Sequence, residues 1–199
     1  IENLDYTLLY DFINDMQEIQ QVSFETLYLT KTQEQLFEFY KVSLLLNRQY
    51  NVAVTNPPYM GNGGMNDKLS EMLKMNYPSS KNDMSTVFME SYLHSIKPEG
   101  YLAMINIPVW MFIKSYAQLR KLILENYTII NMLHLGRGVF GADFGTTSFV
   151  IKGQLVEKYE GFYKRLFSSS SAVEDVERKL QLLADNKTTF LQKQNIFKY

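Results

Sequence analysis

The sequence predicts an α/β fold in which helices cover the faces of a parallel or mixed sheet. Short apolar runs at residues 51–55, 101–107 and 129–135 have the length and the β-branched content of strands. The segments at residues 82–97 and 115–126, which lie between these runs, are predicted to be helices. Strands that alternate with helices along a chain are typical of parallel or mixed sheets.

Residues 1–50, which precede the first predicted strand, are expected to be helical. Their apolar side chains recur at spacings of three and four, the period of one helix face. The two series are Leu4, Leu8, Phe12, Met16 and Ile19, and then Leu36, Phe37, Tyr40 and Leu44. We interpret residues 1–50 as a helical insertion placed before the sheet.

A tetrapeptide directly after the first predicted strand is the most informative motif of the chain. It consists of Asn56, Pro57, Pro58 and Tyr59. The preceding Val52 and Val54 suit a strand buried in a parallel sheet. Because ligands of open α/β folds bind beyond the carboxyl ends of the strands, the tetrapeptide is predicted to line a ligand site.

The residue types of this motif suit the methylation of a planar amino nitrogen. The exocyclic amine of adenine is a poor nucleophile because its lone pair is delocalised into the ring. The side-chain oxygen of Asn56 and the carbonyl of Pro57 can accept its N–H bonds and stabilise the positive charge that grows during attack. Pro57 and Pro58 stiffen the turn, and Tyr59 offers a flat face to a base swung out of the duplex. A rigid turn without catalytic function is the alternative.

The elements after the tetrapeptide follow one another in a specific order. A Gly-rich segment, residues 60–66, is read as a loop near DNA, and a helix over residues 82–97 is expected to begin at Asp83 as its N-cap. A Lys-Pro-Glu-Gly turn at residues 97–100 leads into the second strand. The later elements are a helix with a capping box made by Ser115 and Gln118, the strand 129–135 and a strand at residues 146–151.

In this order of motifs the chain resembles the adenine-specific DNA methyltransferases of phage-defence systems of the BREX, PglX-like type. Relatives of that family include type IIG and type I modification subunits. The resemblance covers residues 45–153 strongly. It implies the catalytic half of a Rossmann-like methyltransferase sheet, S-adenosyl-L-methionine as cofactor, double-stranded DNA as partner, and base flipping. It also implies a second aromatic against the base, for which Phe140 occupies the matching place and Phe144 is the next candidate.

The main cofactor-binding residues of such an enzyme are not found in this sequence. The family places a Gly-rich turn after its first strand, and no such turn precedes Asn56. We therefore expect an internal fragment of a larger enzyme, inactive when isolated. The fragment is expected to fold without measurable affinity for S-adenosylmethionine. Its open edge at residues 52–55 is then expected to self-associate or to be covered by residues 1–50.

The charge distribution along the chain is compatible with a surface that faces DNA. The net charge is −1, but residues 1–40 hold eight of the 21 acidic residues and one of the 20 basic ones, which leaves 13 acidic and 19 basic residues elsewhere. An excess of positive charge is what a phosphate-facing surface needs. Lys114 and Arg137 fall near the expected active-site edge and are candidates for contacts with the DNA backbone.

Composition excludes some kinds of site and bears on the location of the protein. Zero cysteines exclude disulfides and cysteine-based zinc sites, and the two histidines, His94 and His134, are read as packing or surface residues, so no metal site is expected. A signal peptide and an apolar run of membrane-spanning length are both absent from the sequence given, so a cytoplasmic location without a membrane partner is expected.

The expected organisation has three zones, and two other functions stay open. Residues 51–153 form the catalytic part, and residues 154–199 a connector toward a target-recognition region, with a strand at 161–167 and a helix at 172–184. One face of that helix carries Val173, Val176, Leu180 and Leu183. A glutamine-amide protein methyltransferase uses the same tetrapeptide. An inert structural fragment, or an assembly surface for defence-system proteins, is the other alternative.

Overall fold

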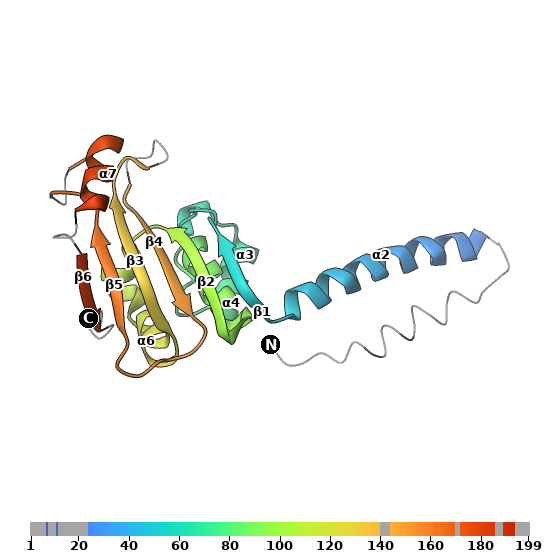
Figure 1. Ribbon diagram of the computed structural model, residues 1–199. Helices are drawn as coiled ribbons and strands as arrows, with labels where there is room; N and C mark the ends of the chain where they lie inside the picture. The colour runs from blue at the N-terminus through green and yellow to red at the C-terminus, as the bar shows by residue number, and fades with distance from the viewer. Residues whose placement is uncertain are drawn as a thin grey trace. The chain divides into compact units, whose positions relative to one another are not determined.

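The computed structural model describes residues 24–139, 144–169, 172–185 and 189–193, together with the single positions Thr7 and Asp11. The chain forms two compact units, Ile1–Arg48 and Gln49–Tyr199 (Figure 1). In the first unit, one long helix is described, α2 (Phe24–Asn47), and it leaves the large apolar side chains of Phe39, Leu45 and Leu46 exposed. The predicted apolar series from Leu4 to Ile19 lies outside the described residues.

The second unit is built on a mixed sheet of six described strands in the order β1-β2-β4-β3-β5-β6 (Figure 1). Their bounds are β1 Tyr50–Thr55, β2 Ile96–Asn106, β3 Thr128–Gly136, β4 Thr146–Lys152, β5 Glu160–Arg165 and β6 Thr189–Lys193. β1 runs parallel to β2 and β5 runs parallel to β3. β4 is antiparallel to both β2 and β3, and β6 is antiparallel to β5. The carboxyl ends of β1, β2, β3 and β5 therefore share one edge, and the predicted α/β fold with a mixed sheet is confirmed.

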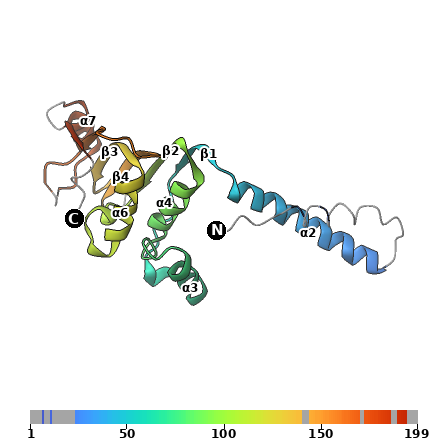
Figure 2. The same cartoon turned by 90° about the horizontal axis from the view of Figure 1, so that it is seen from below.

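Two helices, α4 (Met84–Ser95) and α6 (Ala117–Asn126), cover one face of this sheet (Figure 2). The other described helices of this unit are α3 (Asp67–Asn76), α5 (Val109–Phe112) and α7 (Val176–Ala184), with short 3-10 turns at η2 (Asn62–Gly64) and η3 (Lys114–Tyr116). Helix α4 begins at Asp83, as predicted, because the Asp83 carboxylate accepts a hydrogen bond of 2.8 Å from the backbone N–H of Ser85.

The hydrophobic core lies between the sheet and these two helices. Met89 and Leu93 of α4 meet Leu119 and Ile123 of α6 over a sheet face formed by Leu102, Met104, Ile129, Met132, Phe149 and Ile151. All of these side chains are buried, and each contributes about 1.5–3 kcal/mol to folding relative to an exposed position. This core fixes the carboxyl ends of β1 and β2 relative to the start of β4.

Helix α7 lies on the other side of the sheet (Figure 2). Tyr163 belongs to the core, so the next residue of β5, Lys164, points to the opposite face. The buried Lys164 ammonium donates a hydrogen bond to the carbonyl of Leu183 in α7. The Lys179 ammonium donates one of 2.6 Å to the carbonyl of Leu135 in β3. Two lysines thus fasten α7 near the carboxyl ends of β3 and β5.

The prediction that Val52 and Val54 are buried is wrong for the described residues. Their side chains are 57% and 75% exposed, whereas Ala53, between them, packs against the core. β1 ends the sheet and pairs with β2 alone among the described strands. Because side chains alternate along a strand, Val52 and Val54 point to the face opposite α4.

Several element boundaries also differ from expectation. The predicted capping box is wrong, because Ser115 lies inside η3 and α6 begins two residues later, with no side-chain cap at Tyr116. Helix α7 starts at Val176 rather than at residue 172, because the Asp175 carboxylate caps it by accepting from the N–H of Arg178. β6 and α3 were not predicted.

The apolar face expected on the last helix is not buried in the described structure. Val173, Val176, Leu180 and Leu183 are 57%, 72%, 59% and 42% exposed, whereas Leu182 is buried. Their spacing was that of a helix, but periodicity does not say whether a partner covers the face.

Candidate active site

The tetrapeptide from Asn56 to Tyr59 follows β1 directly, at the edge where the carboxyl ends of β1 and β2 meet. The Asn56 and Pro58 side chains are exposed, Pro57 is buried, and Tyr59 is half-buried. Pro57 therefore packs the turn against the protein, while the Asn56 side chain is exposed at the carboxyl edge of the sheet.

The Tyr59 hydroxyl links the motif to the neighbouring strand. It donates a hydrogen bond of 2.7 Å to Oδ1 of Asn56, and the carbonyl of Ile105 in β2 lies 3.2 Å away as a second acceptor. Burial, with a smaller contribution from the negative charge of Asp83, raises the pKa of Tyr59 above its usual value. The hydroxyl therefore remains a donor at neutral pH, and it orients the Asn56 oxygen.

A second aromatic ring lies against Tyr59. The Phe144 ring is in edge-to-face contact with Tyr59, with centroids 5.5 Å apart and planes at 89°. Phe144, which directly precedes the loop's last residue before β4, is 43% exposed. Phe140, the first candidate for this place, lies outside the described residues. The described structure therefore brings together Asn56, Tyr59 and Phe144.

A buried hydrogen-bond network connects the elements that form this edge of the sheet. Asn106, the last residue of β2, is fully buried, and its Oδ1 accepts from Nε1 of Trp110 at 3.1 Å and from the Thr147 hydroxyl at 3.0 Å. Nη1 of Arg120, also buried, donates to the carbonyls of Trp110 and Ile113 at 2.8 Å each. The network joins β2, β4 and α6, and it includes the core residue Trp110.

Asn106 was not identified from the sequence. The available signal was a polar residue at the end of an apolar strand, shortly before a proline, at an edge where ligands bind. Such a residue is either functional or satisfied by partners far along the chain, and the sequence does not distinguish these cases.

The segment after the tetrapeptide turns back and is tied to the start of α4. The N–H of Met84 donates to the carbonyl of Met60 at 2.9 Å, and Gly61 forms an isolated antiparallel bridge with Asp83. The Gly-rich loop closes on itself, since the N–H of Gly64 donates to the carbonyl of Gly61 at 2.9 Å. It then leads into α3, whose N-terminus is capped by Asn66. This hydrogen-bonded turn fixes where the chain goes after Tyr59.

The two basic candidates lie near the same edge of the sheet. Arg137 directly follows Gly136 at the carboxyl end of β3 and is half-buried. Lys114 opens η3, beyond the carboxyl end of β2, and is exposed. A contact of either residue with DNA stays a prediction.

The His134 side chain in β3 packs against aromatic rings. Its ring lies 4.7 Å from that of Phe167 in an edge-to-face arrangement and 6.1 Å from that of Phe112. Burial, together with the positive charge of Arg165, lowers the pKa of His134 to about 4, so the ring is neutral at physiological pH. Across the described residues, no cluster of three or more His, Cys, Asp or Glu side chains suits a metal ion.

In the described part of the chain, no helix combines the length and the apolar character that crossing a membrane requires.

Comparison with known proteins identifies the protein family. The model of the Eco57I restriction-modification methylases matches residues 2–140. The chain belongs to the Eco57I restriction-modification methylase family.

Two curated relatives of this Eco57I-family chain agree with the resemblance to PglX-like enzymes, which is confirmed. The adenine-specific methyltransferase BrxX of Escherichia coli (strain HS) is 37% identical over 172 residues, covering 82% of the chain and 13% of BrxX. The adenine-specific methyltransferase PglX of Lacticaseibacillus casei (strain Zhang) is 38% identical over 159 residues, covering 78% of the chain and 13% of PglX. The chain thus spans about an eighth of the length of these relatives.

Solved structures share the fold of the Eco57I-family chain. A modification subunit of a putative type I restriction enzyme from Vibrio vulnificus YJ016 matches 71% of the chain and 33% of its own length, with a TM-score of 0.54 and 14% identity. The DNA-bound type ISP restriction-modification enzyme LlaBIII matches 86% of the chain and 13% of its own length, with a TM-score of 0.54 and 16% identity.

Proposed function

We propose that this chain carries the amine-activating part of an S-adenosylmethionine-dependent N6-adenine DNA methyltransferase that acts in DNA modification and phage defence. One observation carries the proposal. The acceptor oxygen of Asn56 and the ring of Tyr59 are held together by a hydrogen bond of 2.7 Å at the carboxyl edge of the sheet, with Phe144 beside them. The names of the curated relatives, both adenine-specific methyltransferases, support the choice of base.

The proposed mechanism activates the amine through acceptors. When adenine enters, one N6 hydrogen is donated to Asn56 Oδ1, whose second lone pair can accept it beside the Tyr59 hydroxyl, and the Pro57 carbonyl accepts the other N–H. These contacts favour a tetrahedral nitrogen and stabilise the positive charge that grows on it, because fixed dipoles outside bulk water act strongly on developing charge. The bond between the methyl carbon and the sulfur of S-adenosylmethionine would break as the nitrogen takes the methyl group, and the alkylated nitrogen would then release a proton to water. A strong general base is not required.

The same pair of aromatic rings is proposed to receive the base. An adenine inside a duplex cannot reach Asn56, so it must be extruded. The face of Tyr59 would stack on the base, an interaction worth about 1–3 kcal/mol. Phe144 stands at 89° to Tyr59 and would bound the base at its edge. Phe140 remains the candidate that the family resemblance implies.

The described residues do not fit a complete cofactor site. S-adenosylmethionine would supply the methyl group as an electrophile. A pocket for it of the Rossmann type needs a Gly-rich turn between a strand and a helix N-terminus that is free to meet the ligand. The Gly-rich turn described here hydrogen-bonds to itself, and Asn66 already caps the helix that follows it. We therefore assign to this chain the residues that contact and activate the adenine amine, and not the main residues that bind S-adenosylmethionine.

The proposed organisation follows from this assignment. Residues 51–153 form the catalytic part, residues 1–50 a helical insertion and residues 154–199 a connector toward a target-recognition region. Double-stranded DNA is the proposed partner, with Lys114 and Arg137 as backbone contacts, alongside proteins of a defence system, in the cytoplasm.

The test is sequencing of genomic DNA for N6-methyladenine in cells with the gene, without it, and with its Asn56→Ala variant. We expect methylation at a defined sequence only with the unchanged gene. Identical methylation in all three would overturn the proposal. Methylated glutamine in cellular protein that depends on Asn56, without methylated adenine, would instead support the protein methyltransferase.

A further inference from the structure

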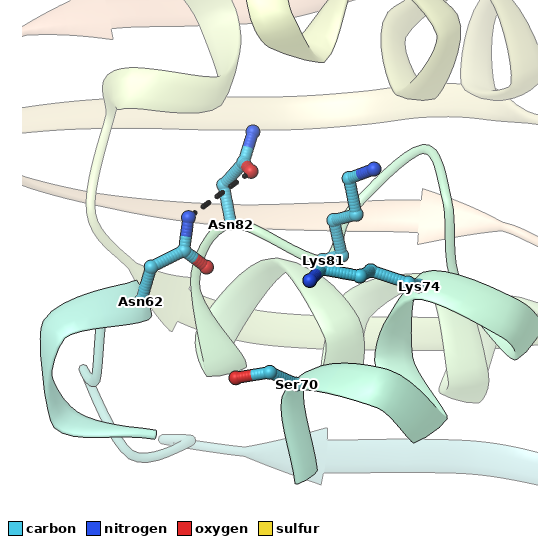
Figure 3. A pocket seen from close by; sticks show the side chains of 5 residues that line it. All are labelled: Asn62, Ser70, Lys74, Lys81 and Asn82. Atoms are coloured by element: carbon cyan, nitrogen blue, oxygen red, sulfur yellow. Dashed lines mark hydrogen bonds between the residues drawn. The ribbon is translucent and has the colours of Figure 1, made fainter. Parts of the chain in front are cut away.

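A small basic hollow lies between α3 and the segment that leads into α4 (Figure 3). Its volume is about 220 Å³, and its lining residues are Asn62, Ser70, Lys74, Lys81 and Asn82. In Figure 3, Lys74 reaches across the hollow toward Asn62, and Ser70 faces it from the same helix. Ser70 and Lys74 share one side of α3 because residues four apart on a helix are neighbours.

The lining has the chemistry of an anion site. Each of the five side chains can donate a hydrogen bond and none is acidic. The structure shows no ion pair for Lys74 or Lys81 within the described residues. Asp83, the next residue after Asn82, is buried, and its carboxylate is engaged by the N–H and hydroxyl of Ser85. The two ammonium groups are therefore available to an external negative charge.

The size of the hollow suits a small group. Pockets for drug-sized ligands have volumes of about 300–1,000 Å³, whereas this hollow has a volume of about 220 Å³. A phosphate group fits such a space. Lysine binds phosphate as a compact point charge on a flexible stem.

The hollow is tied to the tetrapeptide through the backbone. Nδ2 of Asn62 lies 3.4 Å from Oδ1 of Asn82, so the turn after Tyr59 and the segment before α4 form one wall. Three residues span at most about 11 Å, which keeps Asn62 within that distance of Tyr59. A nucleotide whose base stacks on Tyr59 has its own and its neighbours' phosphates within a comparable distance of the base.

We propose that this hollow binds a backbone phosphate of the DNA strand that carries the extruded base, with Lys74 and Lys81 supplying the charge and Ser70 and Asn62 the hydrogen bonds. The proposal rests on the proposed function as a DNA enzyme. The contact would hold the strand while the base leaves the stack. Because it touches no base edge, it contributes affinity without sequence preference.

The first experiment measures lysine reactivity in the intact natural protein. A lysine-acylating reagent is applied with and without a short duplex DNA, and the modified lysines are quantified by mass spectrometry. We expect the duplex to protect Lys74 and Lys81 several-fold. The exposed Lys68, on α3 but outside the hollow, should react equally in both samples. Equal reactivity of all three lysines with and without DNA, despite measurable DNA binding, would overturn the proposal.

Two further arms of this experiment identify the source of the phosphate. Inorganic phosphate should protect the two lysines only weakly at concentrations where the duplex protects them fully. Protection by inorganic phosphate with none by the duplex would indicate a free-phosphate site and overturn the assignment to DNA. Protection by polyglutamate with none by the duplex would indicate an acidic protein partner and overturn it equally.

The second experiment uses the variants K74Q and K81Q, with K68Q as the matched control. Each loss of a phosphate contact should lower the slope of log affinity against log salt by about 0.9. The double variant should bind duplex about ten-fold more weakly at moderate salt, uniformly across sequences. Unchanged affinity and slope in a protein that still methylates adenine would sink the phosphate site and leave the proposed function intact. Failure of the unchanged protein to bind any DNA would overturn both.

Discussion

The hydroxyl of Tyr59 donates to Oδ1 of Asn56 at 2.7 Å, so the two residues of the tetrapeptide that are expected to meet the base contact each other in the free protein. The acceptor needed for the amine is thus already engaged by one donor, and its second lone pair can accept the amine N–H. The hydrogen bond meanwhile holds the amide in one orientation. The free protein keeps its acceptor satisfied and oriented at the same time.

Replacement of Asn56 by Ala should lower the rate of methylation by about 10²–10³-fold. The reason is loss of an acceptor whose contact with the amine strengthens as positive charge develops. Single-turnover methylation of a cognate duplex by the intact protein measures this rate. Asn51→Ala, at an exposed position on β1, the strand that precedes Asn56, is the control and should be near wild type. A rate for Asn56→Ala close to that of the control would remove Asn56 from the mechanism.

Replacement of Tyr59 by Ala should weaken capture of the extruded base by about 1–3 kcal/mol, whereas Tyr59→Phe should be mild. Stacking uses the ring, whereas the hydroxyl contacts Asn56 and Ile105 and not the base. Fluorescence of 2-aminopurine at the target position reports extrusion directly. Equal damage by both substitutions would show that orienting Asn56 through the hydroxyl matters more than stacking.

Phe144→Ala should weaken base capture in the same fluorescence assay, because its ring is in contact with Tyr59. We expect a loss of about 0.5–1.5 kcal/mol, the value of a favourable aromatic pair. Phe140→Ala is the matched comparison. A larger loss for Phe140→Ala than for Phe144→Ala would return the role of second aromatic to Phe140.

Asn106→Ala should lower the free energy of unfolding by about 1–3 kcal/mol, because it leaves the Trp110 N–H buried without its acceptor. Urea unfolding monitored by the fluorescence of Trp110, the single tryptophan of the chain, suits the purpose. Asn76→Ala, at an exposed site, should change stability by less than about 0.5 kcal/mol. Equal stability of the two variants would mean that the network is not important for folding.

Stability should fall as the pH drops from about 6.5 toward 4. The pKa of His134 is lowered to about 4 in the folded protein, so across this range the unfolded chain binds a proton that the folded one does not. Because the ring is partly exposed, we expect a loss of about 1–2 kcal/mol rather than the full linkage value. Urea unfolding at several pH values, compared between wild type and His134→Gln, tests this. The variant should lack this part of the pH dependence, and identical profiles would exclude His134 as its source.

The elements with strong local signals were predicted correctly. The apolar runs that became β2, β3 and β4 and the Asp83 cap follow from residues close together in sequence. Helix α3 was missed because the segment after the Gly-rich residues 60–66 was assigned no secondary structure, although Asn66 caps the helix. Exposure of Val52 and Val54 depends on which elements lie across the sheet, which a strand's own composition does not record.

The candidate site shows the same contrast between local and distant signals. Asn56 and Tyr59 could be proposed from the sequence because their chemistry is contained in four consecutive residues. Phe144 and Asn106 owe their places to the register of β4 against β2, where Asn106 pairs with Thr147. Two phenylalanines four residues apart in one loop look alike in sequence, and only the path of the chain distinguishes them.

Because β4 runs in the reverse direction, the candidate site is formed by strand ends of two kinds. β1 and β2 reach it with their carboxyl ends, whereas β4, antiparallel to both of its neighbours, reaches it with its amino end. The described ends of the connection between these two strands, Gly136 and Thr146, pair with each other in adjacent strands. Phe144, which lies shortly before β4, and the tetrapeptide, which follows β1, are thus placed by strands that approach the site from opposite directions. The two sides of the site are built by separate parts of the chain.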